Sequence, residues 1–270
     1  MSQPLGNLPI NAKIKFGTIF NNPMVWQIKA KNHPGYPDQS VTVVTERIIR
    51  LMAVDAMEAA NSDSNRKIYG NNRYIHSNLR QWLNKTGHPW YVAQHTADAP
   101  PTAANTIMIS TPYDNVPGFL TGFTPEEIDA IISTTLVVNR AAVDDGGGQD
   151  TFSDKIFLLS STEVGFTADT AQGSLLEGFV TDNPSPLAYP TADAVRESSW
   201  KEGVNTGAAW LWWLRTPVAS DPPSVRIVST SGTPFWGHAY SGRVGLRPAC
   251  NLSATQRLVG PDEDLCYTLI

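Results

Sequence analysis

Hydrophobic and polar residues alternate along much of the first fifty positions, which is the pattern of β-strands. The alternation runs over residues 14–20, stops at the Asn-Asn-Pro turn 21–23 and resumes over residues 24–28. Because side chains of a strand point alternately to opposite faces, two such runs joined by a short turn predict a β-hairpin. Residues 41–45 are rich in Val and Thr and predict a third strand.

Residues 77–84 and 124–132 instead show the spacing of an amphipathic helix. In the first segment the apolar residues lie on one helical face, Ser77 is the expected N-cap and Gly87 the stop signal. In the second segment Thr occupies the cap, Pro the first helical position and Glu the third, which together form a complete N-terminal signature. The sequence therefore predicts two helices.

The second half of the chain is dominated by predicted strands and turns. After a glycine-rich break at 143–150, the apolar run 155–160 predicts a buried strand. Three further runs predict a meander with two long loops; the strands are 210–214, 225–229 and 243–249, and the loops are 218–224 and 233–242. Because side chains alternate along a strand, Trp212 and Trp213 are expected on opposite faces, one in the core and the other either in the core or facing a partner.

Composition excludes several classes of protein. The chain has 270 residues, 41% of them hydrophobic, which suffices for the core of one large domain. Its formal net charge of -5 provides no basic field, so we expect no nucleic-acid binding. No apolar stretch approaches the roughly 18 residues of a membrane span, and the N-terminus lacks the pattern of a signal peptide. We therefore expect synthesis in the cytoplasm and no membrane insertion.

Residues that carry chemistry are few. The sequence has no nucleophile elbow, phosphate-binding loop or dinucleotide-binding motif. The histidines show no metal-ligand spacing, so neither a metal site nor a cofactor is expected. The Asp144-Asp145 pair is compatible with calcium binding, although a solvated turn explains it as well. Cys250 and Cys266 are expected to be reduced, with a disulfide between them left open. These observations predict no catalytic residue.

Several short motifs occur in an order that resembles a known family. They are LRQWLN at 79–84, a Phe-Thr-x-x-Glu helix start at 123–127, DKIFLLS at 154–160, WLRTP at 213–217 and GLRPA at 245–249. This order resembles a family of uncharacterised bacterial and phage domains with W-L-R-[ST]-P and G-[VL]-R-P-A motifs. That family is distantly similar to the superfamily of C-type-lectin-like domains and formylglycine-generating enzymes.

The resemblance implies both a fold and a domain division. The fold is α+β and C-type-lectin-like, with small twisted antiparallel sheets, two helices and long loops. The chain divides into an N-terminal arm at 1–13, the domain itself at 14–256 and a C-terminal tail at 257–270. In phage and bacterial members the loop face serves adhesion, and in some of them it is diversified by retroelements.

From this resemblance we expect a non-enzymatic phage virion protein of the tail or receptor-binding kind. It would form a homo-oligomer and recognise a host surface glycan or protein through its C-terminal loops. One alternative is a structural tail, baseplate or capsid-decoration subunit that contacts other virion proteins. A second is a thiol oxidase of the formylglycine-generating type. Against the second, Cys250 stands where relatives carry an apolar residue, and no cationic neighbours in sequence would lower the pKa of either thiol.

The candidate ligand-binding residues lie in the two C-terminal loops, and they are Ser220, Asp221, Ser224, Phe235, Trp236, His238 and Tyr240. Aromatic residues together with Ser and Gly are typical of binding loops, because they offer rigid contact area at a small entropic cost. They also suit stacking against sugar rings. Alternatively, Phe235 and Trp236 fold back onto the sheets. Arg215 and Arg247 are interpreted as partners of carboxylates or carbonyls inside the fold.

Overall fold

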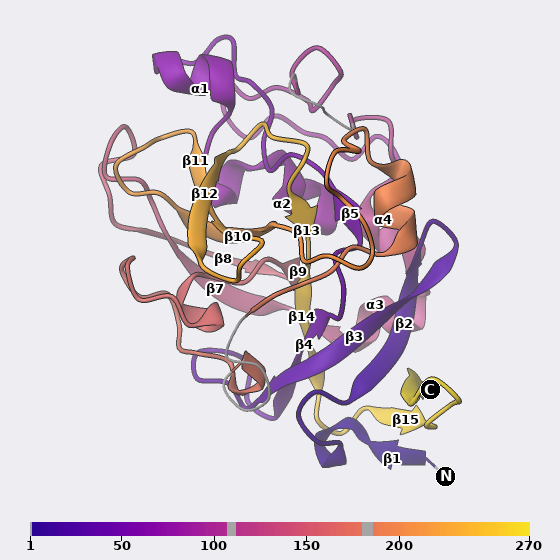
Figure 1. Ribbon diagram of the computed structural model, residues 1–270. Helices are drawn as coiled ribbons and strands as arrows, with labels where there is room; N and C mark the ends of the chain where they lie inside the picture. Colours follow the sequence, from indigo (N-terminus) through magenta and orange to yellow (C-terminus); the bar gives the residue numbers. More distant parts are fainter. Residues whose placement is uncertain (1, 107–111, 180–185) are drawn as a thin grey trace.

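The alternating segments of the sequence pair into a large sheet that crosses the molecule in the computed structural model, which describes residues 2–106, 112–179 and 186–270 (Figure 1). Its strands follow the order β1 (Ser2–Pro4), β15 (Arg257–Val259), β16 (Cys266–Leu269), β2 (Lys13–Ile19), β3 (Asn22–Lys31), β4 (Ser40–Thr45), β14 (Ala249–Ser253) and β6 (Ile131–Ile132), and β9 (Ile156–Phe157) also pairs with β14. The predicted hairpin is confirmed as β2 and β3, and the predicted third strand as β4, antiparallel to β3. The buried strand expected over 155–160 is limited to the two residues of β9.

A second sheet contains the C-terminal strands. Its order is β12 (Pro234–His238), β11 (Ser224–Val228), β10 (Trp212–Pro217), β13 (Gly245–Leu246) and β5 (Arg50–Leu51). The predicted meander is wrong in two respects. The expected loop 233–242 contains β12, which pairs with β11 along its whole length, and the expected strand 243–249 lies beside β10 on the other side and in parallel.

The expected strand 243–249 is also divided between the two sheets. Gly245 and Leu246 belong to the second sheet, whereas the chain from Ala249 onward pairs with β4 in the large one. Pro248 lies at the change of sheet, where a residue without an amide proton cannot extend the ladder that it leaves. The remaining two strands, β7 (Thr134–Asn139) and β8 (Gln149–Asp154), form a separate hairpin that surrounds the predicted break.

Four α-helices of six residues each occur among the described residues, where two were expected: α1 (Ser64–Tyr69), α2 (Asn78–Leu83), α3 (Pro125–Ala130) and α4 (Ala192–Glu197). The two expected helices are α2, whose N-cap Ser77 accepts a hydrogen bond from the Arg80 amide, and α3, whose capping box joins Thr124 and Glu127. α3 ends two residues early because Ile131 and Ile132 pair with β14. α1 and α4 each have a single buried residue, Arg66 and Ala194, so no apolar face predicts them from the sequence.

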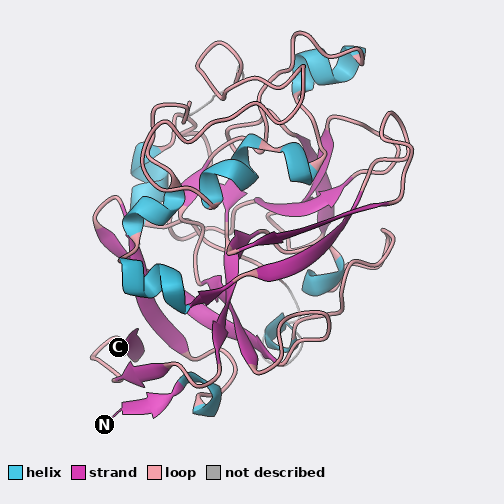
Figure 2. Ribbon diagram, turned by 180° about the vertical axis from the view of Figure 1, so that it is seen from behind, coloured by secondary structure: helices cyan, strands magenta, loops and turns pink. Residues whose placement is uncertain are grey.

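Short 3-10 helices connect the larger elements, and these are Leu5–Asn7, Tyr74–His76, Phe119–Gly122, Thr162–Val164 and Glu177–Phe179. In the view from behind, the strands run through the middle of the molecule and long loops cover its upper end (Figure 2). Within the described residues, no helix has both the length and the apolar composition needed to cross a lipid bilayer.

The core contains both tryptophans of β10. Trp212 and Trp213 are each fully buried, so neither faces a partner. Their indole N–H groups donate to the Pro186 carbonyl at 3.0 Å and to the Met52 carbonyl at 2.8 Å. Because each polar tip has a partner, burying both rings adds apolar contact without leaving an unsatisfied donor.

Arg215 forms the internal pair that the sequence suggested. Its Nη1 and Nη2 atoms each lie 2.7 Å from a carboxylate oxygen of Glu163, and Nη1 also donates to the Leu158 carbonyl at 2.7 Å. Arg215 is 2% exposed and Glu163 is fully buried. The Glu163 carboxylate further accepts hydrogen bonds from the Ser160 amide and the Tyr36 hydroxyl. Both carboxylate oxygens of Glu163 are therefore occupied, while Arg215 Nε has no hydrogen-bond partner among the described residues.

The segments 2–13 and 257–270 lie side by side at one end of the molecule (Figures 1 and 2). β1 pairs with β15, and β16 runs parallel to β2. Lys15 of β2 also contacts Asp262 and Asp264 of the C-terminal segment, each at 2.8 Å. Both segments thus extend the large sheet.

Candidate functional site

Three of the predicted ligand-binding residues, Phe235, Trp236 and His238, lie on the edge strand β12, and Tyr240 follows shortly after it. The register of β11 and β12 places Ser224 opposite His238 and Arg226 opposite Trp236. β12 is the outermost strand of its sheet, and only β11 pairs with it among the described strands. Pro234 is its first residue, a position at which an edge strand tolerates proline.

The aromatic rings of this strand form a continuous row. The ring centroids of Phe235 and Trp236 are 5.8 Å apart with planes 14° from parallel, and His238 follows 5.4 Å from Trp236. Tyr69, at the end of α1, lies 4.2 Å from His238 and 5.6 Å from Tyr240. Such separations are within the range in which aromatic rings attract each other.

The row borders a cavity of about 420 Å³, which we call the aromatic groove; its lining residues are Tyr69, Trp200, Leu211, Ile227, Phe235, Trp236, Gly237, His238, Tyr240, Ser241, Arg243 and Val244. Phe235 is 54% exposed and Trp236 is 43% exposed. The alternative in which these two rings fold back onto the sheets is therefore wrong. Tyr240, by contrast, is buried and forms part of the floor.

Polar groups of the aromatic groove come from His238, Ser241 and Arg243. Burial lowers the pKa of His238, although the nearby Asp221 carboxylate opposes this, so the ring is neutral at pH 7. A neutral imidazole offers one donor and one acceptor. The Arg243 guanidinium lies 5.9 Å from the Trp200 ring, at the exposed side of the groove.

The predicted residues of the first loop do not reach the aromatic groove. Ser224 is fully buried, and its hydroxyl donates to the Asp221 carboxylate at 2.6 Å. The Asn72 side-chain amide holds the same turn through the carbonyls of Val218, Asp221 and Ser224. Ser220 is exposed, but it lines another cavity of about 580 Å³ beside Arg226. The single predicted site is thus divided, and Ser224 and Asp221 hold the turn together.

Tyr69 and Trp200 of the aromatic groove were missed from the sequence. Both are distant from residues 233–242 in the chain, and Tyr69 lies in α1, which has no apolar face that would predict it. The sequence signal at Trp200 is a tryptophan within a charged and small-residue segment, which has no obvious core to join.

Among the described residues, one group of side chains has metal-binding atoms close together. Glu58, His95 and Asp98 each place one such atom within 4.8 Å of the others. The two carboxylates already accept hydrogen bonds, Glu58 from the Asn71 side chain and Asp98 from the Gln94 amide and the Asn78 side chain. His95 Nε2 lies 2.7 Å from Glu58 but forms no hydrogen bond among the described residues. A cation would have to compete with this network.

In the Asp144-Asp145 pair, which was considered for calcium binding, Asp145 forms an ion pair inside the protein. Both carboxylate oxygens of Asp145 contact the Arg66 guanidinium, at 3.0 and 2.7 Å. Arg66 is itself 6% exposed, so Asp145 serves as the counter-charge of a buried cation.

Cys250 and Cys266 are free thiols, and both are buried. Burial raises the pKa of Cys250 well above its usual range and also raises that of Cys266. A nucleophilic or metal-binding cysteine needs the thiolate form, which this environment disfavours.

Comparison with known proteins yields one match. A family model described as a domain of unknown function, DUF6273, matches residues 39–254 and therefore both C-terminal motifs and the aromatic groove. Neither the curated proteins nor the solved structures gave a significant match to the chain.

Proposed function

The chain belongs to the DUF6273 family of domains of unknown function, and from the aromatic groove we propose that it is a recognition domain that binds carbohydrate. The observation that carries this proposal is the exposure of two stacked rings, Phe235 and Trp236, on an edge strand. Large apolar side chains gathered at one exposed place mark binding surfaces in soluble proteins.

The chemistry of the aromatic groove suits a sugar. The C–H face of a pyranose packs against aromatic rings, and its hydroxyl groups need both donors and acceptors. Trp236 and Phe235 offer the rings, while neutral His238, the Ser241 hydroxyl and the Arg243 guanidinium are available at the same cavity. A cavity of about 420 Å³ has the size of an ordinary small-ligand site.

The finer fold assignment, to the C-type-lectin-like superfamily, is part of the same proposal. It is supported by the way in which the motifs behind the resemblance gather. The WLRTP and GLRPA segments are distant in sequence, yet Trp212 of β10 pairs with Gly245 of β13 in the centre of one sheet. The motifs therefore form the scaffold that carries β11 and β12.

The setting that we propose is a phage virion, in which a homo-oligomer of this chain recognises a glycan or protein of the host surface. Retroelement diversification of residues 233–242 belongs to this proposal. The genome provides its test: a reverse-transcriptase gene and a near-copy of the 3′ coding segment should lie nearby, and their absence would remove diversification from the proposal.

The second candidate is a structural subunit of the virion, and the edge position of β12 favours it. An edge strand presents unpaired amide and carbonyl groups, to which a strand of another protein can add. Here Phe235 and Trp236 would pack against that protein instead of a sugar.

A glycan array with the wild type and Trp236→Ala separates these candidates. We expect the wild type to bind a defined set of glycans and Trp236→Ala to lose most of that binding. Val92→Ala is the matched control, because Val92 is 62% exposed and lies outside the aromatic groove. Equal binding by the wild type and Trp236→Ala would refute the groove as the site, and absence of any glycan binding would favour the structural subunit.

A further inference from the structure

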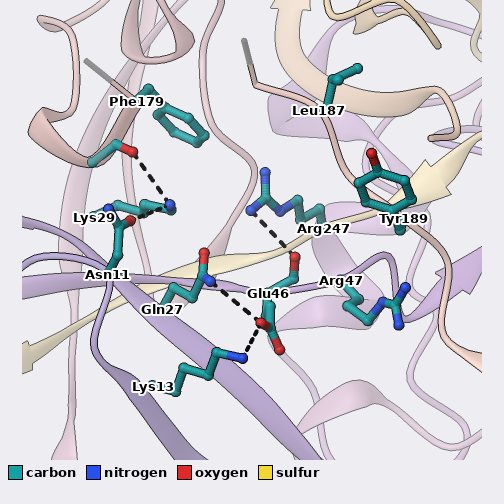
Figure 3. A pocket seen from close by; sticks show the side chains of 11 residues that line it. Asn11, Lys13, Gln27, Lys29, Glu46, Arg47, Phe179, Leu187, Tyr189 and Arg247 are labelled. Carbon is teal, nitrogen blue, oxygen red and sulfur yellow. Dashed lines mark hydrogen bonds and ion pairs between the residues drawn. The ribbon is translucent and has the colours of Figure 1, made fainter. Parts of the chain in front are cut away.

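Another cavity lies beside the large sheet, where β2, β3 and the segment after β4 meet Arg247 (Figure 3). It has a volume of about 570 Å³. We call it the cationic pocket, because its lining residues include Lys13, Lys29, Arg47 and Arg247. Phe179 and Tyr189 provide aromatic walls on either side of the Arg247 guanidinium (Figure 3).

Among the described residues that line the cationic pocket, positive side chains outnumber negative ones. Glu46 is the acidic residue among the described lining side chains, and its carboxylate lies 2.6 Å from Lys13. Among the described residues, Arg47 and Arg247 have no ion-pair partner, in a chain whose formal net charge is -5. A concave surface of one sign concentrates ions of the opposite sign.

Arg247 has an unusual environment for a buried cation. Its residue exposure is 3%. Nε donates to the Thr45 carbonyl at 2.8 Å, and Nη2 lies 3.5 Å from the Glu46 carbonyl. Nη1 has no hydrogen-bond partner among the described residues. Burial lowers the pKa of Arg247 to about 10, so the side chain is still charged at pH 7.

Arg215 provides the comparison within the same fold. It is buried to the same degree, yet both of its Nη atoms contact the Glu163 carboxylate. Arg247 has carbonyls and the faces of Phe179 and Trp212, at 5.7 and 5.1 Å, but these carry no net negative charge. The Glu46 carboxylate lies near enough to raise the pKa of Arg247, but it pairs with Lys13 and forms no ion pair with Arg247. Because a buried cation is stabilised by a direct counter-charge, an anion from outside the chain would complete this site.

Lys29 and Arg47 extend the positive surface. Lys29 is 7% exposed, and its ammonium donates to Asn11 and lies 5.2 Å from the Phe179 ring centroid. Arg47 donates to the Thr206 carbonyl at 2.7 Å and lies 6.0 Å from the Tyr189 ring. The two aromatic rings are therefore flanked by cations, which suits a ligand with an acidic group and a flat or ring-shaped body.

We propose that the cationic pocket binds a small organic oxyanion, a carboxylate or a phosphate, whose charged group contacts Arg247 and whose body packs between Phe179 and Tyr189. This site is separate from the aromatic groove and does not depend on the function proposed for it. Carboxylate and phosphate share the oxygen geometry that guanidinium recognises.

The test is isothermal titration of the full chain with glucuronate, glucose 6-phosphate, inorganic phosphate and uncharged glucose. We expect at least one of the two sugar anions to bind, more tightly than inorganic phosphate, and glucose not to bind. Glucuronate alone would identify a carboxylate site, and glucose 6-phosphate alone a phosphate site. Binding should weaken with added salt. Absence of binding by every anion, or equal binding of glucose, would overturn the proposal.

Two substitutions act in opposite directions. Arg247→Gln should weaken anion binding by about tenfold or more, because it removes a charged hydrogen-bond donor. Glu46→Gln should strengthen anion binding several-fold, because it removes the negative charge of the cationic pocket. Lys67→Gln and Glu202→Gln are matched controls at exposed positions outside the pocket.

Glu46→Gln keeps the test decisive if Arg247→Gln does not fold. A general loss of structure would weaken binding, so tighter binding by Glu46→Gln can come only from the electrostatics of the cationic pocket. Unchanged affinity in Glu46→Gln would contradict the proposal. Trp236→Ala should bind these anions like the wild type, which separates a failure of this site from a failure of the aromatic groove.

Discussion

The buried pair of Arg215 and Glu163 allows a sharp test of how the fold is stabilised, through the substitution Glu163→Gln. Four donors surround the Glu163 carboxylate: the Nη1 and Nη2 atoms of Arg215, the Ser160 amide and the Tyr36 hydroxyl. Glutamine has nearly the same shape, but one of its two oxygen positions becomes an NH₂ group. In either orientation this new donor faces two existing donors.

Glu163→Gln also leaves Arg215 as a buried cation without a counter-charge. Breaking a buried ion pair by removing one partner typically costs about 3–5 kcal/mol. Whole domains have unfolding free energies of about 5–15 kcal/mol, so this single change removes a large share of the stability. We therefore expect Glu163→Gln to lower the free energy of unfolding by about 3–5 kcal/mol.

Urea denaturation followed by tryptophan fluorescence measures this loss, since the chain has eight tryptophans, several of them in the core. Glu202→Gln, at an exposed position, is the control and should change the unfolding free energy by less than about 0.5 kcal/mol. A loss below about 1 kcal/mol in Glu163→Gln, with an unchanged denaturant slope, would show that the buried pair contributes no more than a surface pair.

Three further predictions concern stability and reactivity. Trp213→Ala should lower the free energy of unfolding by about 3–5 kcal/mol, because it empties a fully buried site. Trp236→Ala, at a 43% exposed position, should change the free energy of unfolding far less. Similar losses for both variants in urea denaturation would contradict the assignment of Trp213 to the core and of Trp236 to the aromatic groove. Burial, Arg73 and His95 lower the pKa of His76 to about 4, below its unfolded value of about 6.5. The folded state therefore disfavours the charged ring, and stability should fall between pH 6.5 and pH 4; His76→Gln should show a smaller fall, and an identical pH profile would refute this. Cys250 should react with a thiol reagent only on unfolding, because it is fully buried in β14; rapid labelling of the native protein, read by mass spectrometry, would show the strand to be open.

Local signals in the sequence were sufficient for several elements. The hairpin of β2 and β3 follows from alternation and a turn, and α3 follows from the capping residues Thr124 and Glu127. The internal role of Arg215 followed from its place beside an apolar strand. The hairpin and the helix depend on residues that are close in sequence. The role of Arg215 depends on its charge, because a buried guanidinium needs hydrogen-bond acceptors around it.

Other elements depend on contacts that a local pattern does not contain. Residues 234–238 have the composition of a loop, and they form β12 because β11 offers a partner along its whole length. Proline at the first position of β12 and glycine within it are more typical of loops, and they made this strand hard to predict. Ile131 and Ile132 extend the apolar pattern of α3, yet pairing with β14 takes them into the sheet.

The two candidate sites differ in how far the sequence revealed them. Part of the aromatic groove could be predicted from the sequence, because Phe235, Trp236, His238 and Tyr240 are close together in the chain. The cationic pocket was not visible, because it combines β2, β3, the segment after β4 and the junction before β14. Lys29 is buried in β3, whereas Val25, Gln27 and Lys31 on the same side of the strand are only partly buried, and no local pattern predicts this difference.

The chain crosses from one sheet to the other within the four residues from Gly245 to Pro248, and Arg247 lies at that crossing. Residues before it complete the sheet that carries β11 and β12, and residues after it form a central strand of the large sheet. Separating the two sheets would require this short segment to leave both ladders, so they are mechanically coupled. A ligand bound to Arg247 would therefore stabilise the segment that connects the two sheets. Its binding would also stabilise the sheet that carries the aromatic groove.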